Sequence, residues 1–230
     1  MMVKKHTISD NLLRVNAQIS IALSRAGREP ESTRLIAVSK TFSADVIREA
    51  YQSGQLRFGE NYVQEAINKI LLLSDLPLEW HFIGPIQSNK TRQIALKFDW
   101  VHSVDRLKIA QRLSEIRSQV GRPLNVCLQV NVTGEETKQG CHVSDVLDLA
   151  RAVRQLPFLD LRGLMTIPEV SAENGLASDT FRRLAELKGS LNQDGFELDV
   201  LSMGMSDDLE IGIQQGATFV RVGRGIFGAR

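Results

Sequence analysis

The chain has 230 residues and a formal net charge of +1, so its composition gives no electrostatic reason to expect binding to nucleic acid or to an anionic membrane. Hydrophobic residues make up 43% and charged residues 24%, which is ordinary for a soluble globular protein. No apolar run approaches the roughly 20 residues that span a bilayer, and the N-terminal stretch lacks the hydrophobic region of a secretory signal, so we expect a cytoplasmic protein.

The first predicted element is an amphipathic helix over residues 8–27, where apolar residues recur near a 3.6-residue period and Gly27 suits a helix end. The periodic positions are Leu12, Leu13, Val15, Ile19 and Leu23. After this helix, eight short apolar runs alternate with helical patterns and are predicted to be strands. They span residues 34–39, 56–60, 80–84, 100–104, 124–132, 161–167, 199–203 and 218–223. The helical patterns between them span residues 44–54, 63–73, 90–98, 106–121, 143–156, 180–193 and 207–216.

This alternation of strands and helices implies a parallel sheet. Eight strands in a chain of this length predict a closed (β/α)8 barrel with an extra N-terminal helix, forming a single domain over residues 1–230. The alternative is an open doubly wound sheet. A doubly wound fold that binds dinucleotides would carry G-x-G-x-x-G after its first strand, whereas SKTFSADV (39–46) contains no glycine.

Two segments at predicted strand ends, SMGMSDD (202–208) and RVGRGIFG (221–228), resemble anion-binding loops. They follow the seventh and eighth predicted strands, where this type of barrel usually binds phosphate. Glycine allows close backbone approach, backbone N–H groups and serine hydroxyls donate hydrogen bonds, and Arg224 adds charge. Either segment alone is explained as a tight turn and helix cap. Together, at the two expected strands, they favour a phosphate site.

Lys40 stands at the end of the first predicted strand, on the same side of the barrel as these two loops. A buried lysine without a partner is costly, and one known use for such a residue is a Schiff base with a carbonyl compound. A carbonyl cofactor with a phosphate group explains Lys40 and both loops, which points to pyridoxal 5′-phosphate (PLP). The alternative is a surface lysine in a strand–helix loop.

The cysteines and histidines do not suggest a metal site. Cys127 and Cys141 lack metal-ligand spacing, and the four histidines are scattered. We expect both thiols to be reduced.

Six motifs, in the same order, resemble the pyridoxal phosphate homeostasis protein family, whose barrel is similar to the N-terminal domain of alanine racemase. They are AVSKT (37–41), FGENYVQE (58–65), WHFIGPIQSNK (80–90), LRGLMTIP (161–168), LSMGMSDD (201–208) and VRVGRGIFGAR (220–230). The resemblance runs from about residue 35 to residue 230, nearly the whole chain. It implies a PLP-binding barrel of fold type III.

The resemblance also implies roles for individual residues. Lys40 would form the Schiff base, Arg221 would lie near the pyridine nitrogen, Asn61 would lie close to the cofactor, and His81 and Gly84 would line the same mouth. The phosphate would be held by the segment from Ser202 to Ser206, with Ser202, Met203, Gly204 and Ser206 as its contacts, and by Gly223 and Arg224. The position of Arg224 is often a small hydroxyl residue in this family. Here either the guanidinium replaces the hydroxyl, or the side chain points to solvent and only the backbone binds.

The family resemblance implies a protein that holds and delivers PLP, has no robust catalysis of its own, and influences amino- and keto-acid pools. Apo forms of PLP-dependent enzymes would be its partners. The alternative is a slow PLP-dependent amino-acid racemase, which needs a base on each face of the cofactor. Alanine racemase-like enzymes take the second base from a tyrosine in another domain of the partner subunit. This chain ends at the barrel, which leaves Tyr62 as the candidate and favours a monomer.

An arginine beside the pyridine nitrogen disfavours protonation of that nitrogen, so the ring would be a weak electron sink. On these grounds we expect a carrier and not an enzyme.

Overall fold

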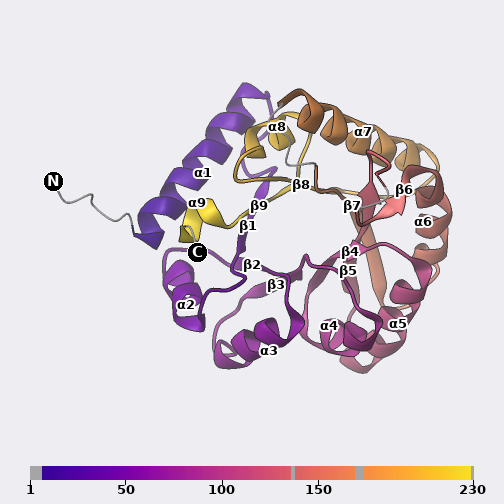
Figure 1. Cartoon of the computed structure of the whole chain (residues 1–230), viewed down its shortest axis with the longest axis horizontal. Coiled ribbons are helices and arrows are strands. Elements are labelled where there is room, and N and C mark those ends of the chain that lie inside the picture. The colour runs from indigo at the N-terminus through magenta and orange to yellow at the C-terminus, as the bar shows by residue number, and fades with distance from the viewer. Residues whose placement is uncertain (1–6, 136–137, 169–173, 229–230) are drawn as a thin grey trace.

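The barrel predicted from the sequence is confirmed by a computed structural model, which describes residues 7–135, 138–168 and 174–228. Eight parallel strands form a ring in which each strand pairs with two neighbours, and helices surround it (Figure 1). In order around the ring the strands are β1 (Arg34–Val38), β2 (Arg57–Glu60), β3 (Glu79–Phe82), β4 (Trp100–Val104), β5 (Leu124–Asn131), β7 (Leu159–Met165), β8 (Val200–Met205) and β9 (Phe219–Val222). An open doubly wound sheet is excluded, because β1 pairs with β9 and β4 pairs with β5.

The helices follow the predicted pattern, with one addition at the end of the described chain. They are α1 (Ile8–Arg25), α2 (Ala44–Gln52), α3 (Val63–Leu72), α4 (Thr91–Lys97), α5 (Leu107–Arg117), α6 (Val146–Arg154), α7 (Asn174–Gln193), α8 (Leu209–Gln214) and α9 (Arg224–Phe227). Three short 3₁₀ helices lie at η1 (Ser88–Lys90), η2 (Ser118–Val120) and η3 (Val143–Asp145). Helix α9 and the two-residue strand β6 (Cys141–His142), which pairs with β5, were not predicted. None of the described helices is long and apolar enough to cross a bilayer.

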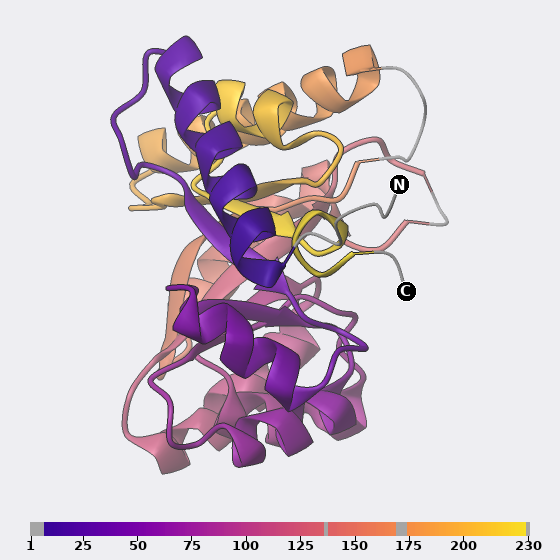
Figure 2. The same ribbon diagram turned by 90° about the vertical axis from the view of Figure 1, so that its left-hand side faces the viewer.

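Helix α1 packs on the outside of the barrel beside α2, α8 and the single turn of α9 (Figures 1 and 2). It ends as predicted, because Gly27 adopts a positive φ of 62° after the last turn. Four of its five periodic apolar residues are buried, whereas Leu13 is 68% exposed on the outer face. The Nδ2 of Asn11 donates to the Ile226 carbonyl at 2.8 Å, so α1 also fixes the position of α9.

The protein has two apolar layers, one between barrel and helices and one inside the barrel. The inner cluster is small and consists of Ile36, Trp100, Cys127, Met165, Val200 and Phe219. Both cysteines are free and buried, and burial raises the pKa of the Cys141 thiol to about 12. Trp100 and Phe219 of this inner cluster pack against the rings of His81 and His102.

Candidate functional site

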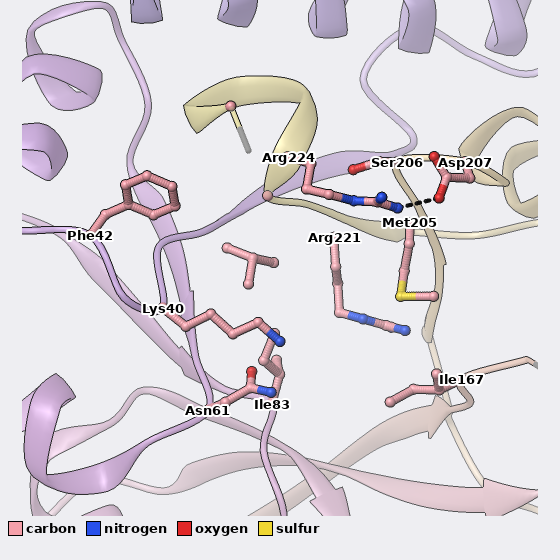
Figure 3. A pocket seen from close by; sticks show the side chains of 13 residues that line it. Lys40, Phe42, Asn61, Ile83, Ile167, Met205, Ser206, Asp207, Arg221 and Arg224 are labelled. Carbon is pink, nitrogen blue, oxygen red and sulfur yellow. Dashed lines mark hydrogen bonds and ion pairs between the residues drawn. The ribbon is translucent and has the colours of Figure 1, made fainter. Parts of the chain in front are cut away.

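A cavity of about 500 Å³ opens at the carboxyl ends of the strands, where this fold places its chemistry (Figure 3). Six residues predicted for the site line it: Lys40, Asn61, Ser206, Arg221, Gly223 and Arg224. Figure 3 shows Lys40 and Arg221 reaching into the same space from the neighbouring strands β1 and β9. The structure therefore brings together a primary amine, a guanidinium and the two glycine- and serine-containing loops.

Lys40 faces the cavity because of the alternation of side chains along β1. Ile36 belongs to the cluster inside the barrel and Val38 lines the cavity, so Lys40, two residues further, points the same way. Ala37 and Ser39 face the surrounding helices instead. The next residue, Thr41, has a φ of 71°, an unfavourable conformation for a β-branched residue. The surrounding structure must therefore hold this turn in place.

A cluster of polar and charged side chains between β1, β2 and α3 holds the turn that contains Lys40 and Thr41. We call Ser39, Glu60, Glu65 and Lys69 the Lys69 cluster. The Nζ of Lys69, which is 5% exposed, lies 2.8 Å from the Ser39 carbonyl, 2.8 Å from Glu60 Oε1 and 2.5 Å from Glu65 Oε1. Glu65 also accepts a hydrogen bond from the backbone N–H of Thr41 at 2.5 Å, and the Ser39 hydroxyl donates to Glu60 at 2.6 Å. Residues on both sides of Lys40 are thus anchored to one cluster.

Glu60 is the most deeply buried member of the Lys69 cluster. Its side chain is fully buried, and Oε2 has no hydrogen-bond partner in the described part of the chain. Burial raises the pKa of Glu60, although Lys69 and the Ser39 hydroxyl act in the opposite direction. Lys69 is therefore the cation that allows a carboxylate to exist at this position.

Asn61 follows Glu60 and turns into the cavity. Its Oδ1 atom is buried and finds no hydrogen-bond partner among the residues that the structure describes. An orphaned buried polar atom is unfavourable, and a donor on a bound ligand would relieve that cost. Asn61 is thus an available polar contact in the cavity wall.

Gly84 does not line the cavity as predicted; it lies behind Asn61. A Cβ at this position would approach the Asn61 carbonyl oxygen to 2.3 Å. Only glycine allows the segment after β3 to pack so closely on the backbone of Asn61. Gly84 therefore contributes to the site by placing Asn61.

We expect Gly84→Ala to destabilise the protein by about 1–3 kcal/mol, because the backbone of Asn61 must move to admit the methyl group. The matched control is Gly189→Ala in α7, where an added Cβ meets nothing within 4 Å. That substitution should leave the free energy of unfolding unchanged or raise it by up to about 1 kcal/mol. Urea unfolding of both variants decides the matter, and equal stability of the two would refute the close-packing role.

His81 also lies away from the cavity, inside the barrel, and the prediction that it lines the mouth is wrong in this respect. The residue is in the middle of β3 and is fully buried, and Ile83 occupies the cavity wall on the same face two residues later. The Nδ1 of His81 lies 2.9 Å from His102 Nε2, and its Nε2 lies 2.8 Å from Glu79. Sequence reasoning gave no information about depth within the barrel.

Three residues predicted for the phosphate loop are part of β8, which extends to Met205 and not to residue 203. Ser202 points into the barrel and is hydrogen bonded to His102 and Arg221 at 2.8 and 2.7 Å. Met203 is buried against the helices, and Gly204, with a φ of 92°, lies against α8. None of the three lines the cavity. The residues of this segment that line the cavity are Met205, Ser206 and Asp207. Other loops contribute Phe42, Ile83 and Ile167 to the cavity wall.

The upper rim of the cavity is formed by the loops after β8 and β9. Helix α9 begins at Arg224, directly after β9, and the first N–H groups of a helix have no partner within it. The Arg224 guanidinium forms an ion pair with Asp207, and the two side chains are 72% and 76% exposed. Arg224 therefore connects the two loops at the rim. Sequence reasoning missed its pairing with Asp207, which only the meeting of β8 and β9 reveals.

Behind the rim, Phe42 and Phe227 pack together with ring centroids 5.0 Å apart. Phe42 comes from the turn that carries Lys40, and Phe227 is the last residue of α9. The contact joins these two parts of the site. Phe42 was not predicted for the site, although its position two residues after Lys40 could have indicated that it lies there.

Comparison with known protein families gives a match that includes every residue of the described site. The family model described as "Alanine racemase, N-terminal domain" matches residues 11–230. The pyridoxal phosphate homeostasis protein of Pseudomonas aeruginosa is 59% identical over 224 residues, covering 97% of this chain and 96% of that protein. The protein of the same name from Vibrio alginolyticus is 48% identical over 228 residues, covering 97% of this chain and 98% of that protein.

Solved structures agree with this family match. PipY of Synechococcus elongatus with PLP bound has a TM-score of 0.81 and 40% identity, covering 91% of this chain and 100% of that chain. Alanine racemase of Clostridium difficile in complex with cycloserine has a TM-score of 0.74 at 13% identity, covering 94% of this chain and 59% of that chain. The second comparison establishes a shared fold.

Proposed function

The chain belongs to the pyridoxal phosphate homeostasis proteins, within the alanine racemase N-terminal domain family, and from this premise we propose that it holds PLP in the cavity between Lys40 and Arg221 and delivers it to other proteins. The observation that carries the proposal is the meeting of Lys40, Arg221 and both loop ends in one cavity. Its volume of about 500 Å³ lies within the usual range for small-molecule sites. The recipients would be apo forms of PLP-dependent enzymes.

The residues present fit the chemical groups of PLP. When bound, PLP supplies an aldehyde that reacts with amines and a pyridine ring that accepts electrons. In our proposal Lys40 provides the amine for covalent attachment, and the orphaned Oδ1 of Asn61 accepts a hydrogen bond from the cofactor. Arg221, on the neighbouring strand β9, would lie near the pyridine nitrogen.

The phosphate would bind at the rim between the loops after β8 and β9. Its contacts in this proposal are the Ser206 hydroxyl and the backbone N–H groups at Gly223 and Arg224. Asp207 neutralises the guanidinium of Arg224 on the solvent side. The backbone and Ser206 therefore take the place of the hydroxyl residue that often follows the glycine in this family, and Arg224 closes the rim.

Two features favour a carrier over a slow racemase. Burial lowers the pKa of Arg221 to about 10, so the residue remains a cation at neutral pH. A cation there opposes protonation of the pyridine nitrogen and weakens the ring as an electron sink. In addition Tyr62, the candidate for a second base, is 54% exposed and is not among the residues that line the cavity.

The decisive experiment follows the α-proton of alanine. The PLP-loaded protein is incubated with L-alanine or D-alanine in D₂O, and NMR measures loss of the α-proton while chiral analysis measures the opposite enantiomer. We expect no more exchange than with the same concentration of free PLP, because Tyr62, the candidate for the second base of a racemase, does not line the described cavity. Sustained turnover that disappears in Lys40→Ala would instead establish the racemase.

A further inference from the structure

Five polar side chains form a continuous hydrogen-bonded line through the inside of the barrel. We call Glu79, His81, His102, Ser202 and Arg221 the interior chain. It begins at Glu79, the first residue of β3, and ends at Arg221 in the cavity. The successive contacts measure 2.8 Å from Glu79 to His81, 2.9 Å from His81 to His102, 2.8 Å from His102 to Ser202 and 2.7 Å from Ser202 to Arg221. Both histidines and Ser202 are 0% exposed, so water does not compete with the bonds among them.

The chemistry of the two ends fixes the direction of every bond. The Glu79 carboxylate can only accept, so Nε2 of a neutral His81 donates to it and Nδ1 of His81 accepts from His102. Nδ1 of His102 then accepts from the Ser202 hydroxyl, whose oxygen accepts from the Arg221 guanidinium. His102 therefore carries its proton on Nε2 and donates to Nδ1 of His81. His81 then carries its proton on Nε2 and donates to the carboxylate of Glu79. All the donors point away from the cavity, and the reverse order would place an unprotonated His81 nitrogen against the Glu79 carboxylate.

The electrostatic surroundings agree with two neutral histidines between two charged ends. Burial lowers the pKa of both His81 and His102, and His81 and Arg221 lower that of His102 further. Although burial opposes it, the hydrogen bond from His81 holds the pKa of Glu79 below its ordinary value. The other charged groups that act on the interior chain are Arg34, Arg57 and Asp99 near Glu79 and Asp208 near Arg221.

Arg221 has unusual partners for a buried cation. It is 4% exposed, and its hydrogen bonds go to the Ser202 hydroxyl and, at 3.0 Å, to the Thr166 carbonyl. Within the described residues no carboxylate forms an ion pair with it. A buried charge without such a partner needs stabilisation by oriented dipoles. The interior chain provides them, because aligned hydrogen bonds polarise one another and end on a carboxylate at the far end of the barrel.

We propose that His81, His102 and Ser202 are positioning residues that hold Arg221 as an oriented cation on the cavity wall, in a chain whose last acceptor is Glu79, which also pairs with Arg57 at 3.3 Å. A carboxylate placed next to Arg221 would cancel its charge and compete for its donors. A chain of neutral groups orients the guanidinium and leaves its charge directed at the ligand. The inference rests on the proposed function only for the identity of that ligand.

Histidine NMR on the protein without cofactor tests the interior chain directly. ¹⁵N shifts of the imidazole nitrogens should show His81 and His102 as neutral Nε2–H tautomers throughout the neutral pH range. In Ser202→Ala, the bond to His81 still holds His102 as the Nε2–H tautomer, but Nδ1 of His102 loses its donor, so the ¹⁵N shift of Nδ1 should move toward that of a nitrogen without a hydrogen bond. A protonated ring or an Nδ1–H tautomer in the unsubstituted protein overturns the inference, whether or not any variant folds.

PLP binding provides the second readout. Ser202→Ala should weaken PLP binding about tenfold or more, the scale of a hydrogen bond to a charged group. Ser114→Ala is the matched control, because Ser114 is also buried and donates to a backbone carbonyl, that of Pro157, far from the cavity. Equal PLP affinity in the two variants would overturn the positioning role. If the unsubstituted protein does not bind PLP at all, the proposed function fails. The NMR result then still shows whether the interior chain has the hydrogen bonds described above.

Discussion

Replacing Lys40 by alanine is expected to abolish covalent attachment of PLP and the yellow colour that it gives to the protein. Lys40 is the lysine whose side chain lines the cavity, at the end of β1 and beside β9, which carries Arg221 (Figure 3). The fold should be unaffected, with a change in the free energy of unfolding within about 0.5 kcal/mol, because the side chain is half-buried at a cavity and not in the core. Absorbance after incubation with PLP and gel filtration measures the attachment.

Two further variants make this result specific. Lys97→Ala removes an exposed lysine from α4 and should bind PLP as the unsubstituted protein does. Lys40→Arg keeps the positive charge but offers no amine for Schiff base formation, so it should fail like Lys40→Ala. Retention of the yellow colour in both Lys40 variants would mean that another amine attaches the cofactor.

Replacing Lys69 by methionine is expected to destabilise the protein by about 3–5 kcal/mol, the effect of removing one partner of a buried ion pair. Lys69 and Glu60 are 5% and 0% exposed, and their charged atoms lie 2.8 Å apart. Methionine has a similar length, so the loss comes from the uncompensated carboxylate of Glu60. The double variant Lys69→Met/Glu60→Gln removes both charges and should recover most of the stability in urea unfolding. Equal losses in the single and double variants would contradict this explanation.

The destabilisation should depend on pH in a defined direction. Burial already raises the pKa of Glu60, and loss of Lys69 removes the cation that opposes this rise. Between the pKa of the unfolded chain and the higher pKa of the folded protein, the folded state binds more protons, so stability falls as pH increases. Lys69→Met should therefore lose less stability at about pH 5 than at about pH 8, where Glu60 must ionise without a partner. A loss that is equal at both pH values would exclude ionisation of Glu60 as its cause.

The barrel could be predicted from the sequence because each strand and helix buries one regular face. Short apolar runs such as residues 34–38 and amphipathic patterns such as α1 give a local signal for each element. Helix α9 and strand β6 have four and two residues, which is too short for any periodicity to show. The end of strand β8 was predicted two residues too early because Gly204 is typical of loops, although here it lies within the sheet.

The site was predictable where a residue's strand position alone decides its direction. Lys40, Asn61 and Arg221 each follow inward-facing residues at a strand end and reach the cavity as expected. The role of Glu60 was not predictable, because the same motif that carries Asn61 directs Glu60 outward to Lys69 of α3. Likewise His81 lies one layer deeper than the mouth and contacts His102, a pairing between two strands that no local pattern encodes.

The attachment site of the cofactor is the central claim, and chemical reduction tests it most directly. The purified protein is loaded with PLP, reduced with borohydride, digested and mapped by mass spectrometry. We predict a single pyridoxyl group on Lys40, in the peptide that contains residues 35–46, and none on the neighbouring cluster residue Lys69. A label on a different lysine, or no label after reduction of the loaded protein, would contradict the assignment of this cavity as a PLP site.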